Sequence, residues 1–454
     1  MTKIFGTNGV RGVVNQDMNI DLAINLGKAM GTWLGKGTAA VGTDSRVSNE
    51  MLKYAVSSGL MATGVSVIDL GKAPTPAVQH YVRGKADMGV VITASHNPPE
   101  FNGIKAVAGD GTEFLNDVEE QIEDIFFSKK FNLVSWKDVG GMTKDDPLPA
   151  YHRAILDYVD LDSIKKAGLK VVIDCANGVG GLSTPYLLRK LGCQVITLNA
   201  QMDGTFPGHE SEPTEKNLAD LKKMVTNVGA DLGIAHDGDS DRAIFFDEKG
   251  NFLHGDKTLT LMAKKMVKEN GGGKVVTPVS SSSSVEDVVK ENDGELIYTA
   301  VGSPIVARKM MEIGGIFGGE ENGGLIFADH QYCRDAPMSA VRIVELMAKS
   351  GSPLSELIEE LPKYALDKRG VFCPDEFKDE LVHKLKEVFQ DQNYDDTDGL
   401  KIVYPQGWVL IRPSGTEPKY RIYSQAKSME QATTLGERHL KEVEKALADL
   451  ESSV

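Results

Sequence analysis

A serine followed by a stiff, polar loop is the first candidate for chemistry in this sequence. Ser95 stands in the stretch TASHNPPEFNGIK, residues 93–105, directly after the apolar segment MGVVITA. Open α/β sheets bind ligands beyond the carboxyl ends of their strands, so this position favours a reactive hydroxyl. Pro98 and Pro99 restrict the backbone that follows, and a restricted loop suits a nucleophile that must be aligned with its target.

Two neighbours of this serine could assist a reaction there. His96 could carry a proton and Lys105 could pair with an anion, and both are near Ser95 in sequence. No G-x-S-x-G elbow surrounds Ser95, which argues against a serine hydrolase. Considered alone, a serine in a turn favours a structural role over a catalytic one.

Three aspartates at alternate positions form a second candidate site. The stretch DGDSDR places Asp237, Asp239 and Asp241 two residues apart and ends in Arg242. Three carboxylates provide the hard oxygen ligands that Mg²⁺ and Ca²⁺ prefer. An EF-hand is excluded because its sixth position requires glycine, and here that position is Arg242. The alternative is a solvated acidic turn.

Two later stretches carry groups that bind hydroxyls and anions. GGEENGG, residues 318–324, places Glu320 and Asn322 among glycines, which let a backbone approach a ligand closely. RPSGTEPKYR, residues 412–421, combines arginines, hydroxyls and the backbone N–H groups around a glycine, a composition typical of an anion cradle. Each could also be an ordinary turn.

The segments that must position these residues alternate between strand and helix patterns. The alternation appears over residues 39–70, 170–198 and 256–301, with helices of 10–15 residues, and it predicts crossover units in mainly parallel sheets. The last eighty or so residues instead predict a smaller α+β domain that ends in a long charged helix from Met429. The serine run at 280–284 is interpreted as a polar loop.

Composition excludes several classes of function. The chain has 454 residues and a formal net charge of −15, and no basic stripe is evident, which argues against nucleic acid as a partner. No apolar run is long enough for a membrane helix, and residues 1–12 lack a signal pattern. Four cysteines without a C-x-x-C pair fit a reducing cytoplasm.

Taken together and in this order, the four stretches resemble loops of the α-D-phosphohexomutase family. They resemble its phosphoserine, metal, sugar-recognition and phosphate-binding loops, and FGTNGVRG, residues 5–12, also matches. The resemblance implies an α/β fold with three similar mixed-sheet domains and a C-terminal α+β domain around a central cleft. The expected bounds are 1–148, 149–250, 251–366 and 367–454.

The resemblance also implies an activity and a set of site residues. Family members are isomerases that move phosphate between the 6- and 1-positions of a hexose, using a phosphoserine, one Mg²⁺ and a sugar 1,6-bisphosphate. The implied catalytic residues are Ser95, His96, Lys105, Arg11 and Arg242, with His96 or Lys105 as the base. The implied metal ligands are Ser95, Asp237, Asp239 and Asp241, and the implied substrate ligands are Glu320, Asn322, Arg412, Ser414, Gly415, Thr416 and Arg421.

Departures from the family pattern leave the sugar open. Asn322 and Gly324 stand where many members have serine and some have histidine. Phosphoglucosamine mutase is favoured, with phosphomannomutase or phosphoglucomutase as the alternative. A metal-dependent sugar phosphatase and a non-catalytic phosphosugar-binding protein are the other classes. The expected partner is a small phosphosugar, with no nucleic acid and no membrane, and the expected assembly is a monomer or homodimer.

Overall fold

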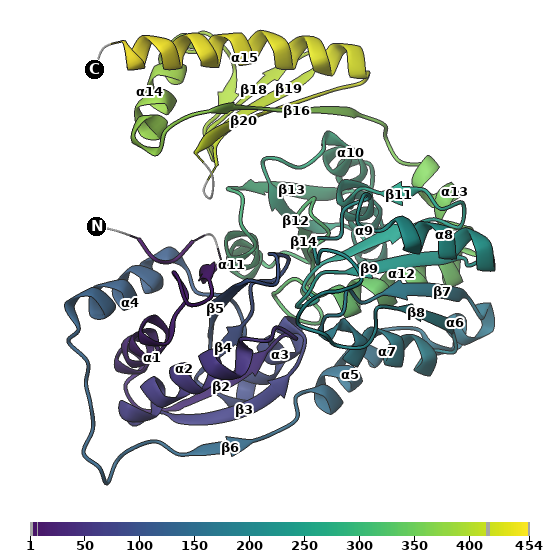
Figure 1. Ribbon diagram of the computed structural model, residues 1–454. Helices are drawn as coiled ribbons and strands as arrows, with labels where there is room; N and C mark the ends of the chain where they lie inside the picture. Colours follow the sequence, from purple (N-terminus) through teal and green to yellow (C-terminus); the bar gives the residue numbers. More distant parts are fainter. Residues whose placement is uncertain (1–2, 7, 415–417, 453–454) are drawn as a thin grey trace.

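The computed structural model divides into four units, each built on one β-sheet (Figure 1). It describes residues 3–6, 8–414 and 418–452. We call the units I to IV in chain order. The expected fold class, three α/β units with mixed sheets and a C-terminal α+β unit, is confirmed. Among the described residues, no helix combines the length and apolar character needed to cross a bilayer.

Unit I contains a six-stranded sheet of order β1-β5-β4-β2-β3-β6, in which β2, β3, β4 and β6 are parallel and β5 is antiparallel to both its neighbours. Strand β4, MGVVI, is central and buried along its whole length, as its unbroken apolar sequence predicts. The strands are β1 (Val10–Val13), β2 (Thr38–Thr43), β3 (Ser66–Lys72), β4 (Met88–Ile92), β5 (Phe101–Ala108) and β6 (Met142–Lys144). The helices are α1 (Ile20–Leu34), α2 (Asn49–Ala62), α3 (Thr75–Lys85) and α4 (Asn116–Ser128).

Unit II contains a five-stranded sheet of order β11-β10-β9-β7-β8. The expected bound between residues 250 and 251 falls in the turn that joins β10 to β11 within this sheet. The strands are β7 (Lys170–Asp174), β8 (Gln194–Leu198), β9 (Leu232–His236), β10 (Ala243–Phe246) and β11 (Phe252–Leu253). The helices are α5 (Leu148–Leu156), α6 (Leu161–Ala167), the 3₁₀ helix η1 (Val179–Leu182), α7 (Thr184–Lys190) and α8 (Ala219–Val228).

Unit III contains a four-stranded sheet of order β13-β12-β14-β15, whose edge strand β15 is antiparallel. The serine run differs from the predicted loop because its last two residues begin helix α10, and the Ser282 hydroxyl accepts a hydrogen bond from the Ser284 N–H. The strands are β12 (Gly273–Pro278), β13 (Gly294–Thr299), β14 (Phe317–Gly319) and β15 (Leu325–Phe327). The helices are α9 (Gly255–Asn270), α10 (Ser283–Glu291), α11 (Ser303–Ile313), α12 (Ala336–Ser350) and α13 (Leu354–Glu359).

Unit IV is an antiparallel sheet of order β16-β20-β19-β18-β17, covered by two helices at the top of Figure 1. The long helix begins at Met429, as predicted, and buries residues at helical spacing such as Leu435 and Val443. The strands are β16 (Ala365–Phe372), β17 (Tyr394–Asp395), β18 (Leu400–Tyr404), β19 (Gly407–Pro413) and β20 (Lys419–Ala426). The helices are η2 (Asp375–Phe377), α14 (Lys378–Val388) and α15 (Met429–Glu451).

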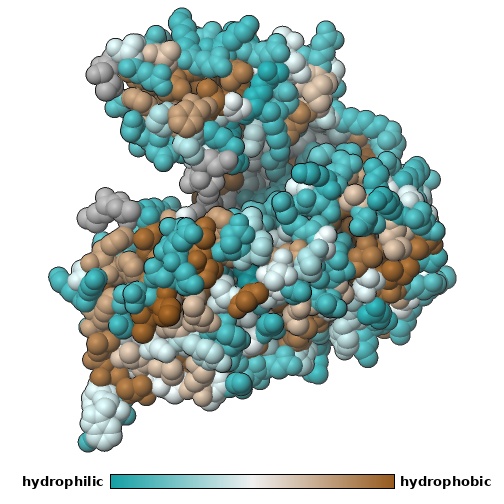
Figure 2. Space-filling model, in the orientation of Figure 1, coloured by the Kyte–Doolittle hydropathy of each residue, from teal (hydrophilic) through white to brown (hydrophobic). Residues whose placement is uncertain are grey.

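The hydrophobic cores explain how these units are joined. One apolar cluster runs through units I, II and III and includes Val78, Ile173 and Leu259. Unit IV has its own core, and a smaller cluster that includes Val279 and Trp408 connects it to unit III. Figure 2 shows the surface hollowed between unit IV, at the top, and the units below it. The first three units therefore form one packed body, to which the fourth is attached over a small area.

Candidate active site

The Ser95 hydroxyl meets the metal-type loop of unit II. Ser95 follows β4, is 2% exposed, and has a φ of 51°, in the left-handed region that is unfavourable for a residue with a β-carbon. Its Oγ donates a hydrogen bond to Asp237 Oδ2 at 2.7 Å. Two segments more than 140 residues apart are thus joined at the serine that the sequence singles out.

Arg46, which the sequence analysis did not select, holds the loop after Ser95. Its Nη1 and Nη2 groups donate to the carbonyl oxygens of Ser95, Asn97, Pro98 and Phe101 at 2.6–2.9 Å. Asp44 pairs with Arg46 Nε at 3.2 Å, and both side chains are fully buried. The rigidity expected from two prolines is therefore reinforced by an arginine that follows strand β2. The sequence feature that could have indicated this role is the D-x-R triplet, residues 44–46, directly after a buried strand.

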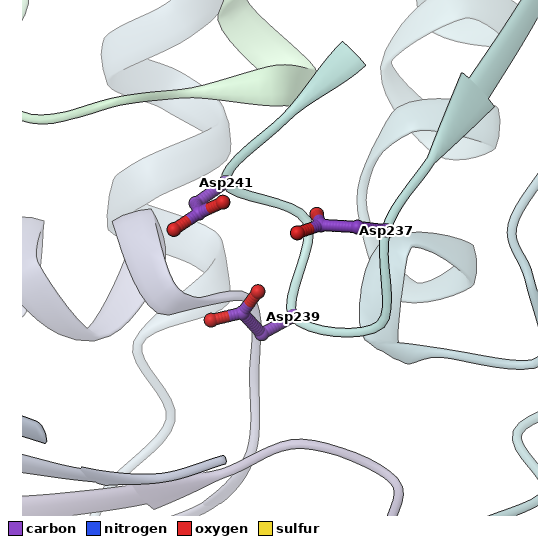
Figure 3. A group of neighbouring side chains, drawn as sticks. All are labelled: Asp237, Asp239 and Asp241. Atoms are coloured by element: carbon purple, nitrogen blue, oxygen red, sulfur yellow. The ribbon is translucent and has the colours of Figure 1, made fainter. Parts of the chain in front are cut away.

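The three aspartates converge in the loop between β9 and β10 (Figure 3). Each offers an oxygen within 4.8 Å of the others, and all three residues are buried. Asp239 Oδ1 and Asp241 Oδ1 are buried without a hydrogen-bond partner. Unpaired buried carboxylate oxygens are costly unless a cation binds them. The donor set therefore fits a hard divalent cation and rules out the simple solvated turn.

Basic side chains offset part of this acidic charge. Lys105 Nζ lies 2.7 Å from Asp239 and 3.3 Å from Asp241. Burial opposes protonation of Lys105, but the two carboxylates outweigh it and raise its pKa. Arg242 Nε contacts Asp237 at 3.0 Å, and its Nη groups contact Glu212. Burial, with repulsion from Asp241, nevertheless raises the pKa of Asp237 to about 7.

Two further predicted residues lie beside the serine. His96 Nε2 is 3.5 Å from Glu212, and its Nδ1 has no hydrogen-bond partner. Burial lowers the pKa of His96 to about 3, and the Arg242 guanidinium adds to the effect, so the ring is neutral at pH 7. Arg11 Nη1 donates to Asn97 Oδ1 at 2.8 Å. The base candidates thus differ, because Lys105 is charged and paired whereas His96 is neutral.

The sugar-type loop lies between β14 and β15 in unit III. Glu320 is 6% exposed, and Asn322 Oδ1 accepts a hydrogen bond from the Gly324 N–H at 3.0 Å. Arg334, another residue not selected from sequence, contacts both Glu320 and Asp241. It follows β15 in the stretch YCRDAP, which carries no pattern that would have indicated a site.

The phosphate-type loop of unit IV is described in part, because Gly415 and Thr416 lie outside the described residues. Arg412 Nη2 pairs with Asp398 at 3.0 Å, and Asp398 also accepts a hydrogen bond from the Val301 N–H of unit III. Ser414 is 2% exposed. Arg421, on the adjacent strand β20, lines the cavity described next.

One cavity of about 650 Å³ brings the four units together. Its wall includes the predicted residues Arg11, Ser95, His96, Arg242, Glu320, Asn322 and Arg421. Lys105 and the three aspartates are not among the lining residues. Asp241 contacts Arg242 and Arg334 of the wall, and Asp237 contacts Ser95 and Arg242. The Ser95 hydroxyl and the polar groups of the sugar-type loop thus share one space, and the three aspartates lie next to it behind Ser95, Arg242 and Arg334.

Comparison with known proteins identifies the family to which this arrangement belongs. Models of phosphoglucomutase/phosphomannomutase match along the chain: alpha/beta/alpha domain I at residues 2–133, domain II at 149–250, domain III at 254–364, and the C-terminal domain at 371–442. The chain belongs to the phosphoglucomutase/phosphomannomutase family. The expected resemblance to phosphohexomutases, and with it the isomerase class, is confirmed.

Similar proteins cover the whole chain. The phosphoglucomutase/phosphomannomutase of Thermococcus kodakarensis is 46% identical over 98% of this chain and 100% of its own. A probable phosphoglucosamine mutase of Methanopyrus kandleri is 44% identical over 96% of each chain. A family member of known structure from Burkholderia thailandensis superposes with a TM-score of 0.88 at 28% identity, covering 98% of this chain and 97% of the other. This phosphohexomutase therefore contains all four domains of its relatives.

Proposed function

We propose that this phosphohexomutase interconverts the 6- and 1-phosphates of a hexosamine through a phosphate carried on Ser95, with glucosamine 6-phosphate as the preferred substrate. The observation that carries the proposal is the Ser95 hydroxyl, 2.7 Å from Asp237 and open to the cavity that Glu320, Asn322 and Arg421 also line. A nucleophile, a cation site and sugar-binding groups are the parts that a phosphoryl transfer between two sugar hydroxyls requires.

The first transfer passes the phosphoryl group from the serine to the sugar. The oxygen of the free sugar hydroxyl forms a bond to phosphorus as the bond from phosphorus to Ser95 Oγ breaks, and the hydroxyl proton passes to a base. The departing Ser95 Oγ takes up a proton in turn, so the products are a sugar 1,6-bisphosphate and the Ser95 hydroxyl. Arg46 supports this step because it holds four carbonyl groups of the serine loop and so keeps Oγ in line.

We assign the base to His96. Its ring lines the cavity beside Ser95 and is neutral at pH 7, so one of its nitrogens carries no proton and can accept one. Lys105 is the weaker candidate because the carboxylates of Asp239 and Asp241 keep it protonated. Arg11 and Arg242 flank the serine and suit the charge that develops on the transferred phosphoryl group.

We assign one Mg²⁺ to Asp237, Asp239 and Asp241, with the serine phosphate as a further ligand. The buried Oδ1 atoms of Asp239 and Asp241, which accept no hydrogen bond, support this assignment. When bound, the ion neutralises negative charge on the phosphoryl group. Exhaustive chelation followed by readdition of Mg²⁺ tests the assignment through activity and through the thermal unfolding midpoint. If neither the activity nor the thermal unfolding midpoint changes, the metal assignment is refuted.

The second transfer requires the bisphosphate to turn so that its other phosphate faces Ser95. The Ser95 hydroxyl gives up its proton as Oγ bonds to that phosphorus. The bond from phosphorus to the sugar oxygen breaks, and the sugar oxygen takes up a proton to become a hydroxyl. We propose that Arg412, Ser414, Gly415, Thr416 and Arg421 of unit IV grip the phosphate distant from the serine. An arginine fork recognises a phosphate without reading the sugar beyond it, so the same grip serves both orientations.

The sugar preference rests on the names of the relatives and on the sugar loop. The Methanopyrus relative is named a probable phosphoglucosamine mutase, which supports glucosamine. The Thermococcus relative is named for glucose and mannose phosphates, which makes those sugars the alternative. Values of kcat/KM for glucosamine, glucose and mannose 6-phosphates, measured side by side, distinguish them. A preference for mannose or glucose would refute the glucosamine assignment.

Two other classes of function are tested by the same assay. A sugar phosphatase would transfer the phosphoryl group to water, and a binding protein would transfer none. The grip on unit IV favours the mutase, because hydrolysis needs no second anion site. We expect isomer formation that is stimulated by added hexose 1,6-bisphosphate and exceeds release of inorganic phosphate. Phosphate release without isomer formation would refute the mutase assignment.

We also propose the compartment in which the enzyme works and its oligomeric state. Cys175, Cys193, Cys333 and Cys373 are buried and free, which supports a reducing cytoplasm. We propose a monomer or homodimer as the working assembly. Light scattering at several protein concentrations measures that state.

A further inference from the structure

Arg334 lies between two loops that belong to different sheets. Its Nη2 donates to Asp241 Oδ2 at 2.6 Å, in the metal loop of unit II. Its Nη1 donates to Glu320 Oε2 at 3.2 Å, in the sugar loop of unit III. The side chain is 11% exposed and lines the cavity. One guanidinium therefore links the carboxylate set proposed for the cation to the carboxylate proposed for the sugar.

The position of Arg334 depends on the absence of a side chain at residue 324. A β-carbon added to Gly324 would lie 2.2 Å from Arg334 Cδ and 2.9 Å from its Cγ. Contacts this short do not occur, so any other residue at 324 must displace the arginine stem. Gly324 is also the last residue of the sugar loop, directly before β15. The missing side chain at Gly324 thus leaves the space that the stem of Arg334 occupies.

The backbone of Arg334 is fixed by the residue that follows it. Asp335 caps helix α12 by accepting a hydrogen bond from the Met338 N–H at 2.9 Å. The same carboxylate accepts hydrogen bonds from the Tyr151 hydroxyl at 2.7 Å and from Gln331 at 2.8 Å. All of these groups are buried. The direction in which Arg334 leaves the chain is therefore set by packing and not by the substrate.

We propose that Arg334 is a positioning residue that fixes Glu320 for the sugar hydroxyls, and that Gly324 is the residue that admits it. The inference rests on the proposed mutase function and deepens it. In this chain the end of the sugar loop presents a guanidinium, and Glu320 is oriented by that guanidinium. A lysine at 334 carries the charge but reaches one carboxylate at a time, because it lacks the fork of N–H donors.

A double-mutant cycle tests the coupling between the two residues. The cycle comprises the wild type, Gly324→Ala, Arg334→Ala and the double variant, each assayed for kcat and KM with glucosamine 6-phosphate. Loss of charged hydrogen bonds predicts a fall in kcat/KM of about 10- to 100-fold for Arg334→Ala. We expect kcat/KM to fall at least about tenfold for Gly324→Ala. The kcat/KM of the double variant should match that of Arg334→Ala within about twofold, because the clash disappears with the arginine. Losses that multiply in the double variant would refute the coupling.

Further variants separate positioning from folding. Arg334→Lys and Arg334→Met retain the aliphatic stem, and we expect both to keep phosphate on Ser95 but to raise KM. Arg334→Lys should keep a thermal midpoint near that of the wild type because it retains the charge, whereas Arg334→Met should lower the midpoint because it leaves two buried carboxylates without their cation. Arg369→Ala is the matched control, because Arg369 pairs with Asp367 and Glu437 within unit IV. A wild-type KM in both stem-retaining variants would refute the positioning role. Absence of isomerisation by the wild type would refute the proposed function instead.

Discussion

At the scale of single residues, Ser95 combines strain with restraint. Its φ of 51° is unfavourable for a serine, at a cost of about 1 kcal/mol or more, yet Arg46 and Asp237 hold it on two sides. Strain that is maintained by several contacts is typical of positions where geometry matters for chemistry. The serine is therefore positioned before any substrate arrives.

The first prediction concerns this serine. Ser95→Ala removes the attacking and leaving oxygen, so we expect mutase activity to fall by at least about 1,000-fold. Intact-mass measurement of the wild type should show a species heavier by one phosphate, and the variant should lack it. Ser58→Ala is the control, because Ser58 lies exposed on α2. Full activity of Ser95→Ala would contradict the assignment.

At the scale of elements, the site depends on close approach between the serine loop and the loop that joins β9 to β10. A β-carbon at Gly238 would lie 2.7 Å from the Ser95 carbonyl oxygen. Gly178, directly before η1, approaches the same loop, since its β-carbon would lie 2.4 Å from the Gly238 carbonyl oxygen. Three segments thus meet backbone to backbone, and glycine is required where they meet.

The second prediction tests this contact. Gly238→Ala should push the metal loop away from Ser95 and cost roughly 1–3 kcal/mol of unfolding free energy. We expect a larger fall in kcat than the change in stability would suggest, because Asp237 moves relative to Ser95 Oγ. Gly141→Ala is the matched control, since a β-carbon there has no neighbour within 4 Å. Equal effects of the two substitutions on kcat would contradict the prediction.

Helix α4 provides a prediction on pH dependence. Glu119 is 7% exposed, and burial raises the pKa of its carboxyl to about 7, with Glu123 adding to the effect against the opposition of Lys3. In the unfolded chain the group titrates near 4.5. The folded state therefore binds the proton more tightly, and the stability gained from the neutral carboxyl is lost as pH rises from 4.5 to 7.

The third prediction follows from this loss of stability with rising pH. Glu119→Gln should raise the free energy of unfolding by roughly 1–3 kcal/mol at pH 8 and by clearly less at pH 5. Urea denaturation of wild type and variant at both pH values measures the difference. Glu120→Gln, at an exposed neighbour on the same helix, should show no such pH dependence. A gain that is equal at both pH values would contradict the argument.

At the scale of the whole molecule, unit IV is joined to the rest by a small polar and aromatic contact. Gln425 on β20 accepts hydrogen bonds from the Ser283 N–H and Trp408 Nε1, and donates to Ser282 Oγ. The serine run of unit III is therefore the surface on which unit IV sits. Since the large shared core excludes unit IV, its position over unit III depends on this contact and on the small cluster around Trp408.

The fourth prediction concerns this contact. Gln425→Ala should leave phosphate on Ser95 but release more free bisphosphate per turnover, because unit IV is held less firmly over the turning intermediate. We expect an increase of about fivefold, which corresponds to roughly 1 kcal/mol of lost hydrogen bonding. Gln431→Ala, at an exposed position on α15, is the control. Bisphosphate release at the wild-type level would contradict a role for this contact in retention.

The sequence by itself determined the fold class and the four loops of the site. Alternating strand and helix patterns indicated the three α/β units, because burial against neighbouring elements imposes a local period on each segment. The motif DGDSDR was also recognisable, since the three aspartates that we propose as ligands of one ion lie within five positions of one another. Each of these predictions depends on residues that are close together in the chain.

Only the tertiary structure decided which residues support those loops. Arg46 contacts a loop about fifty residues away, and Arg334 contacts Asp241 across 93 residues. No local pattern encodes such pairs, because each depends on how two separately folded segments pack. The structure also separated Lys105, which is paired beneath the aspartates, from His96, which lines the cavity. Which side chain faces the cavity depends on tertiary packing, which the order of residues along the chain does not show.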